Sequence, residues 1–123
     1  MKLRVALAQI NPTVGDLAGN AGLIAAAVKS AQAQGANLIV FPEMIVTGYP
    51  VEDLALRPSF QAASIKAVEQ IAAGITGDLV AVVGYLDKGP KNAVAVIHDE
   101  KLRRDMSSAI CLTMASLMNL ETL

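Results

Sequence analysis

Glu43 is the residue whose type and setting most clearly suggest chemistry. It follows an apolar run, Asn37 to Phe41, that is typical of a buried strand. Open α/β sheets usually place ligands at the carboxyl ends of their strands. Pro42 restricts the backbone between the two, so the carboxylate is held at a stiff strand exit. A carboxylate held in this way suits a general base. An ordinary solvated glutamate at a strand exit is the alternative, and the residues alone leave it open.

The rest of the chain offers few other reactive side chains. His98 is the single histidine, and we interpret it as the end of an apolar strand rather than as a ligand. Cys111 is the single cysteine, which excludes an internal disulfide and fits a reducing, cytoplasmic compartment. The sequence has neither a His/Cys cluster nor a glycine-rich phosphate loop. We therefore expect no metal and no cofactor to be bound by this segment.

The elements around Glu43 predict an α/β layered domain. Apolar runs predict four strands and helical spacing predicts two helices. The strands are expected at residues 3–10, 37–41, 78–86 and 92–98, and the helices at 17–34 and 59–75. The order β-α-β-α-β-β favours parallel early strands and an antiparallel late pair, which residues 101–103 could extend as a hairpin.

Composition excludes several classes of protein. Apolar residues make up 54% of the 123 residues and charged residues 17%, far from the pattern of a disordered chain. The formal net charge of −1 gives no electrostatic reason to expect nucleic acid or an anionic membrane as a partner. No apolar stretch approaches the length needed to span a bilayer.

Two segments carry a resemblance to a known family. VALAQINPTVGDLAGN (residues 5–20) and LIVFPEMIVTGYPVEDLALRPSF (residues 38–60) closely resemble the N-terminal part of the carbon–nitrogen hydrolases of the nitrilase superfamily. The stretch TGYPVEDLALRPSF is more similar to the glutaminase domains of glutamine-dependent NAD synthetases than to general amidases. The resemblance covers residues 1–104, so we expect a partial hydrolase domain over this range.

The resemblance implies a fold and a mechanism. The fold would be the N-terminal part of a four-layer αββα sandwich. The family uses a Glu-Lys-Cys triad, in which Cys attacks the carboxamide carbon, Lys stabilises the oxyanion and Glu, here Glu43, shuttles the proton. Tyr49 resembles a substrate-side aromatic residue, although a packing role is equally open. The substrate would be glutamine. In a homo-oligomeric parent, the ammonia would pass to a separate domain that uses ATP and Mg to amidate nicotinic acid adenine dinucleotide to NAD.

The chain departs from the family after Arg104. The family's Lys motif does not follow, Lys101 lies too early and suits a solvated strand end, and Cys111 arrives before any Lys motif. Codons for Ser107 to Thr122 can be chosen so that a shifted frame encodes KRHLPNYGVFDEFRD, which is the missing motif. We therefore expect residues 105–123 to be an out-of-frame tail and the chain by itself to be inactive. Two alternatives stay open, a fragment of another nitrilase-family amidase and a non-catalytic interaction module.

Overall fold

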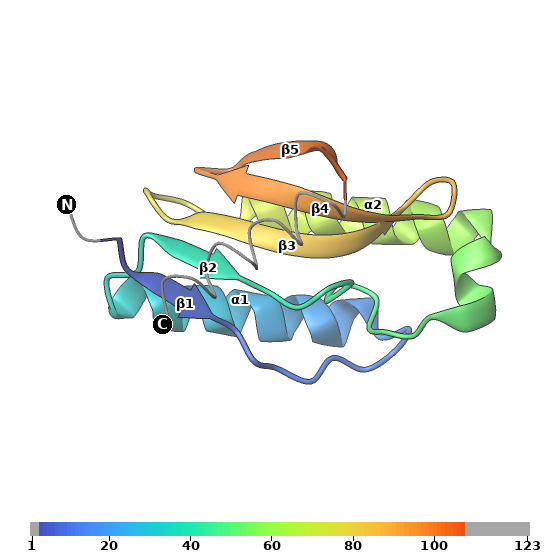
Figure 1. Cartoon of the computed structure of the whole chain (residues 1–123), viewed down its shortest axis with the longest axis horizontal. Coiled ribbons are helices and arrows are strands. Elements are labelled where there is room, and N and C mark those ends of the chain that lie inside the picture. The colour runs from blue at the N-terminus through green and yellow to red at the C-terminus, as the bar shows by residue number, and fades with distance from the viewer. Residues whose placement is uncertain (1–2, 108–123) are drawn as a thin grey trace.

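The protein folds around one five-stranded sheet. The computed structural model describes residues 3–107, with side chains through residue 103. The strands lie in the sheet in the order in which they occur in the chain (Figure 1). They are β1 (Val5–Leu7), β2 (Leu38–Val40), β3 (Val80–Asp87), β4 (Lys91–His98) and β5 (Lys101–Ser107). The helices are α1 (Leu17–Ala33), the short 3₁₀ helix η1 (Glu52–Leu56) and α2 (Pro58–Ala73).

Strand directions follow the connections between the strands. β1 and β2 are parallel, as are β2 and β3, because a helix lies between the strands of each pair. β3 and β4 form an antiparallel hairpin in which Val80 lies opposite His98. β5 returns antiparallel to β4, with an irregularity in the register between Val94 and Val96. The predicted parallel and antiparallel pairs, including the hairpin at residues 101–103, are confirmed.

Helix α1 begins and ends where its sequence specifies. Asp16 caps the first turn, since its carboxylate accepts a hydrogen bond from the Gly19 N–H at 3.0 Å. Just past the helix, Gly35 adopts a φ of 73°, which a glycine tolerates without strain. One stripe of the helix is buried, and its members are Asn20, Ile24, Val28 and Ala31. The spacing of these residues is that of one helical face.

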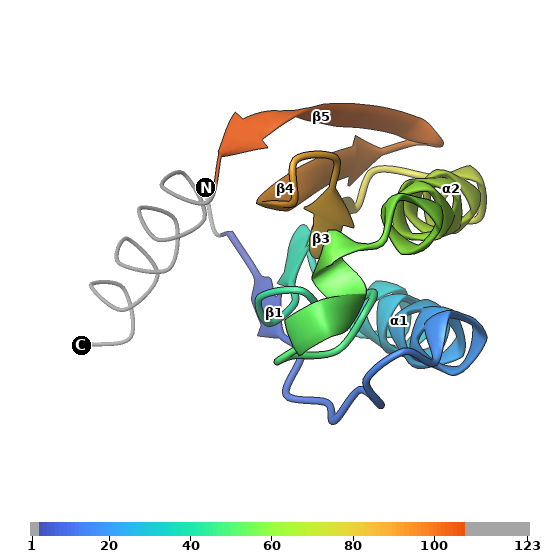
Figure 2. The same ribbon diagram turned by 90° about the vertical axis from the view of Figure 1, so that its right-hand side faces the viewer.

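Both long helices pack on the same face of the sheet (Figure 2). Helix α2 starts with Pro58 at its first turn, where a missing N–H costs nothing, and buries Ser64, Val68 and Ile71. The Ser64 hydroxyl accepts a hydrogen bond from the Leu86 N–H of β3 at 3.1 Å. The helices and the sheet side chains that face them form one apolar core. The described residues therefore form one α layer and one β layer, and the expected α/β class is confirmed.

The observed elements differ from the expected ones in three places. β1 is shorter than the expected strand at residues 3–10, although the Ala8 N–H still donates to the Val40 carbonyl at 2.9 Å. The helix η1 is an addition, because a single 3₁₀ turn carries too few residues to show a periodic pattern. β5 continues past the predicted boundary at residue 104, and the tail from residue 108 onward lies outside the described residues. None of the helices in residues 3–107 is long and apolar enough to cross a membrane.

Candidate active site

Glu43 lies at the carboxyl end of β2, as the sequence predicts. β2 ends at Val40, and the Phe41 N–H still donates to the Val82 carbonyl of β3 at 3.1 Å. Phe41 is buried, whereas Pro42 and Glu43 are exposed. The chain therefore leaves the sheet at Pro42 and presents the carboxylate of Glu43 outward from a fixed strand end.

The backbone at Glu43 rests directly on β3 at Gly84. A Cβ atom at Gly84 would lie 2.6 Å from the Met44 nitrogen, 3.2 Å from the Pro42 oxygen and 3.3 Å from the Glu43 carbonyl carbon. Such distances leave no room for any side chain. Gly84 also accepts a hydrogen bond through its carbonyl from the Val46 N–H at 3.2 Å. This glycine therefore lets the loop that carries Glu43 dock on the sheet.

Asn20 of α1 fixes the same loop from the other side. Its side chain is 1% exposed, and its Oδ1 accepts a hydrogen bond from the Thr13 N–H at 2.8 Å. Its Nδ2 donates to the Thr13 carbonyl at 2.9 Å and to the Val46 carbonyl at 3.0 Å. The Gly15 N–H adds a bond to the Thr47 carbonyl at 2.9 Å. Residues 44–48 are accordingly buried, although they form neither a helix nor a strand.

Asn92 contacts the carboxylate of Glu43 itself. The amide Nδ2 of Asn92, near the start of β4, donates a hydrogen bond to Oε1 of Glu43. Asn92 is half-buried and Glu43 is exposed. A carboxylate has two oxygens that accept hydrogen bonds, so this contact orients the group through one oxygen and leaves the second available.

The other candidate residues lie in different settings. Tyr49 is 67% exposed and follows the buried loop, and its role toward substrate stays a prediction. Lys101 begins β5 and His98 ends β4, and both are exposed, which confirms their placement at strand ends. Cys111 lies outside the described residues.

Sequence reasoning missed Asn20, Gly84 and Asn92. Asn20 carries a signal, because a polar residue occupies a position on the apolar stripe of α1. Gly84 interrupts an apolar strand, which can mark a close approach of another backbone. Nothing local distinguishes Asn92, whose contact with Glu43 joins residues 49 positions apart.

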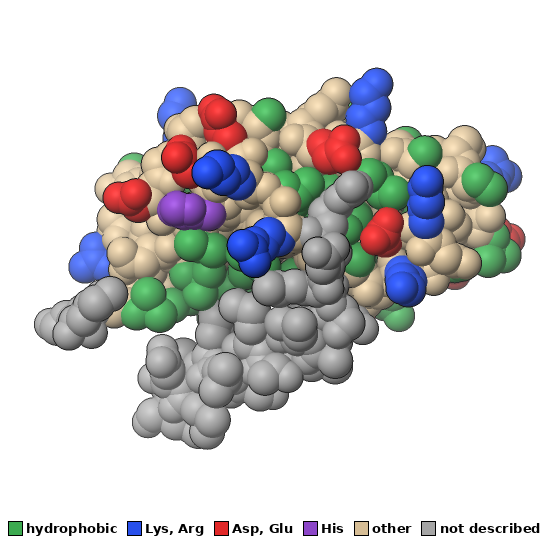
Figure 3. Space-filling view, turned by 90° about the horizontal axis from the view of Figure 1, so that it is seen from above, with side chains coloured by type: hydrophobic (Ala, Val, Ile, Leu, Met, Phe, Trp, Pro, Cys, Tyr) green, Lys and Arg blue, Asp and Glu red, His purple; other side chains and the backbone are tan. Residues whose placement is uncertain are grey.

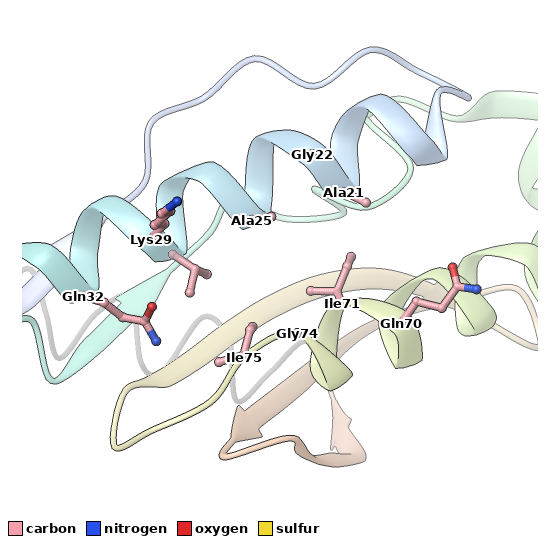
Figure 4. Close-up of a pocket in the computed structure, with 10 residues that line it drawn as sticks. Ala21, Gly22, Ala25, Lys29, Gln32, Gln70, Ile71, Gly74 and Ile75 are labelled. Carbon is pink, nitrogen blue, oxygen red and sulfur yellow. The ribbon is translucent and has the colours of Figure 1, made fainter.

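A groove between α1 and α2 is separate from this site. It encloses about 550 Å³, and Figure 4 shows Gly22 and Ala25 of α1 facing Ile71 and Ile75 across it. Lys29 is the one ionisable side chain among its lining residues. None of the residues around Glu43 lines this groove. On the face seen in Figure 3, acidic and basic side chains are interspersed over the described residues.

Comparison with known proteins places the chain in a family. The sequence model of the family described as "Carbon-nitrogen hydrolase" matches residues 4–114. The chain is 40% identical over 104 residues to a glutamine-dependent NAD(+) synthetase of Rhodobacter capsulatus, covering 82% of this chain and 19% of that protein. It is 44% identical over 98 residues to one from Xylella fastidiosa strain Temecula1, covering 79% of this chain and 17% of that protein.

Solved structures agree with the sequence matches. A glutamine-dependent NAD(+) synthetase from Cytophaga hutchinsonii superposes with a TM-score of 0.78 at 25% identity, over 84% of this chain and 18% of that one. An amidase from Nesterenkonia sp. shares the fold, with a TM-score of 0.65 at 23% identity over 80% of this chain and 38% of that one. The chain spans less than a fifth of the length of the two synthetase relatives named above. It belongs to the carbon–nitrogen hydrolase family.

Proposed function

We propose that this chain is the front part of a glutaminase domain, which releases ammonia from glutamine for the synthesis of NAD in a longer parent enzyme. The observation that carries the proposal is Glu43, a carboxylate held at a strand end by backbone contacts to β3 and by the amide of Asn92. Support comes from the relatives, which are glutamine-dependent NAD(+) synthetases at 40% and 44% identity.

In this function Glu43 acts as the general base. Amide hydrolysis by a cysteine nucleophile requires a group that takes the thiol proton and delivers a proton to the leaving amine. Glu43 is exposed, so its free oxygen is open to a reacting group. Its main chain is fixed by Gly84, so the carboxylate can be aimed without reorganisation of the backbone. The nucleophile and the oxyanion-stabilising lysine would come from other parts of the parent enzyme.

A shift of the reading frame would account for the missing lysine. We propose that residues 105–123 are translated out of frame, because a permitted choice of codons for Ser107 to Thr122 encodes KRHLPNYGVFDEFRD in the shifted frame. That motif contains the lysine that the family uses. In this proposal the chain alone lacks both the lysine and the nucleophile and hydrolyses no amide.

The experiment replaces Glu43 in the full-length protein encoded by the restored frame. Glu43→Gln keeps the shape of the side chain but removes the base, so the glutamine-driven rate should fall at least about 100-fold. The ammonia-driven rate should be unchanged, because that reaction does not use the hydrolase site. Glu69→Gln, on the exposed side of α2, is the matched control and should leave both rates unchanged. If Glu43→Gln retained normal use of glutamine, Glu43 would not be the base.

The products made by the wild-type full-length protein distinguish a synthetase parent from a stand-alone amidase. A synthetase parent makes NAD from nicotinic acid adenine dinucleotide with either glutamine or ammonia as nitrogen donor. A stand-alone amidase releases ammonia from a small amide and makes no NAD. The two sequence relatives named above are both glutamine-dependent NAD(+) synthetases, at 40% and 44% identity, and this favours the first outcome.

A further inference from the structure

We propose that Asn92 is a positioning residue for Glu43, which fixes one carboxylate oxygen so that the other is aimed at the reacting proton. The inference rests on the proposed function, because it assigns Glu43 as the base. Its direct observation is the hydrogen bond from Nδ2 of Asn92 to Oε1 of Glu43.

The β3–β4 hairpin places Asn92 on the same side of the sheet as Glu43. Asn92 pairs with Leu86 in the antiparallel register. Its neighbour Ala93 packs in the core beneath the helices, so the alternation of side chains along a strand directs Asn92 to the opposite face. Gly84 lies on that opposite face too, two positions before Leu86 on β3, and supports the backbone of Glu43.

One hairpin therefore holds both ends of Glu43. Gly84 of β3 fixes the main chain through close backbone contact, and Asn92 of β4 fixes the carboxylate. Glu43 is exposed, so its side chain would otherwise sample several rotamers at similar free energy. Asn92 is half-buried in a paired strand, so its amide is a more rigid partner than water. The hydrogen bond selects a single carboxylate orientation out of those rotamers.

An amide also matches the chemistry of the base. The NH₂ group of Asn donates a hydrogen bond but cannot take up the proton that Glu43 must carry. A neutral partner leaves the negative charge of the carboxylate in place. A second carboxylate at position 92 would repel Glu43, and the two would share a proton. That sharing would remove the free base while keeping the shape of the side chain.

The difference between an amide and a carboxylate at position 92 defines the test, which uses the full-length protein encoded by the restored frame. Asn92→Ala should lower kcat for glutamine hydrolysis about 10- to 100-fold, because the carboxylate loses its orientation. Asn92→Asp should lower kcat further, although Asp has nearly the same shape as Asn. KM for glutamine should stay constant in both variants, because Asn92 acts through Glu43. The ammonia-driven rate should also stay constant, because that reaction does not use the hydrolase site.

Lys91→Ala is the matched control. Lys91 is exposed, begins the same strand and lies next to Asn92, and its replacement should leave kcat unchanged. If Asn92 served only to hold the hairpin together, Asn92→Asp would be milder than Asn92→Ala, and that order would overturn the proposal. An unchanged kcat in Asn92→Ala would also overturn it. A wild-type protein that releases no ammonia from glutamine would instead refute the proposed function, before any variant is compared.

Discussion

Removal of the Asn20 side chain should release the loop that carries Glu43 while leaving the sheet in place. Asn20 is buried and joins α1 to two loops through the Thr13 N–H, the Thr13 carbonyl and the Val46 carbonyl. In Asn20→Ala all three backbone groups lose their bond to the Asn20 amide, although the Thr13 carbonyl still accepts from the Asp16 N–H at 3.1 Å. Thr13 is exposed, so water can replace its two bonds, whereas Val46 is fully buried and its carbonyl is left unsatisfied.

The expected loss follows from these three bonds. A buried polar group left without a partner costs about 1–3 kcal/mol, and a hydrogen bond exchanged with water about 0.5–1.5 kcal/mol. The loop should therefore open more easily by about 3 kcal/mol, which corresponds to roughly 100-fold faster local amide exchange. The Gly15 N–H donates to the Thr47 carbonyl at 2.9 Å, and the Val46 N–H donates to the Gly84 carbonyl at 3.2 Å. Exchange of these two amides therefore reports the opening of the loop.

Hydrogen exchange measured by mass spectrometry resolves the effect on the full-length protein. Peptides covering residues 11–16 and 44–48 should lose protection in Asn20→Ala, and peptides from β3 and β4 should keep it. The control is Gln32→Ala on the same helix, which removes one exposed bond to the Thr76 carbonyl at 2.9 Å. Unchanged exchange at residues 44–48, or an equal loss of protection throughout the domain, would refute this account of Asn20.

Three further predictions concern the loop, the isolated chain and its gene. Gly48→Ala should destabilise the domain by about 3 kcal/mol, because Gly48 has a φ of 79° and a Cβ there would lie 2.7 Å from the Val14 Cα. Gly77→Ala should cost only about 1–2 kcal/mol, because Gly77 has a φ of 88° but a Cβ there would lie in open space. Urea denaturation of the two variants measures their stabilities, and equal urea midpoints would contradict a steric clash with Val14. The purified 123-residue chain should release no ammonia from glutamine in a coupled ammonia assay, and measurable turnover would show that the missing lysine and nucleophile are dispensable. The genomic nucleotide sequence should encode KRHLPNYGVFDE in the shifted frame downstream of Asn92, and a shifted frame without this motif would make the tail a genuine terminus.

The sequence predicted the elements well because each has a periodic pattern that depends on its own residues. The predicted helix at 17–34 is observed as Leu17–Ala33, since Ile24, Val28 and Ala31 mark a single buried face. The predicted strand at 92–98 is observed as Lys91–His98, with alternate side chains in the core. A pattern of this kind specifies which face is buried, and therefore which neighbours an element acquires.

The contacts that hold Glu43 in place could not be predicted in the same way. The position of Glu43 followed from a local feature, a strand that ends at a proline. The partners of Glu43 come from elsewhere, with Asn92 49 residues away and Gly84 on the neighbouring strand. A hydrogen bond between a loop and a distant strand leaves no period in the sequence, and Asn92 resembles any polar residue at the start of a strand. Only the register of β3 against β4, in which Leu86 lies opposite Asn92, brings the amide to the carboxylate.

The arrangement around Glu43 also indicates how the site is divided along the chain. The described residues hold Glu43 from three directions, through β3 beneath it, β4 beside it and α1 behind its loop. Glu43 itself is exposed, so the remaining side of the residue is open. In the proposed function, the nucleophile must approach from that side, because the backbone contact at Gly84 closes the other. In that function the described residues would position the base, and turnover would need the lysine and the nucleophile from the rest of the parent enzyme.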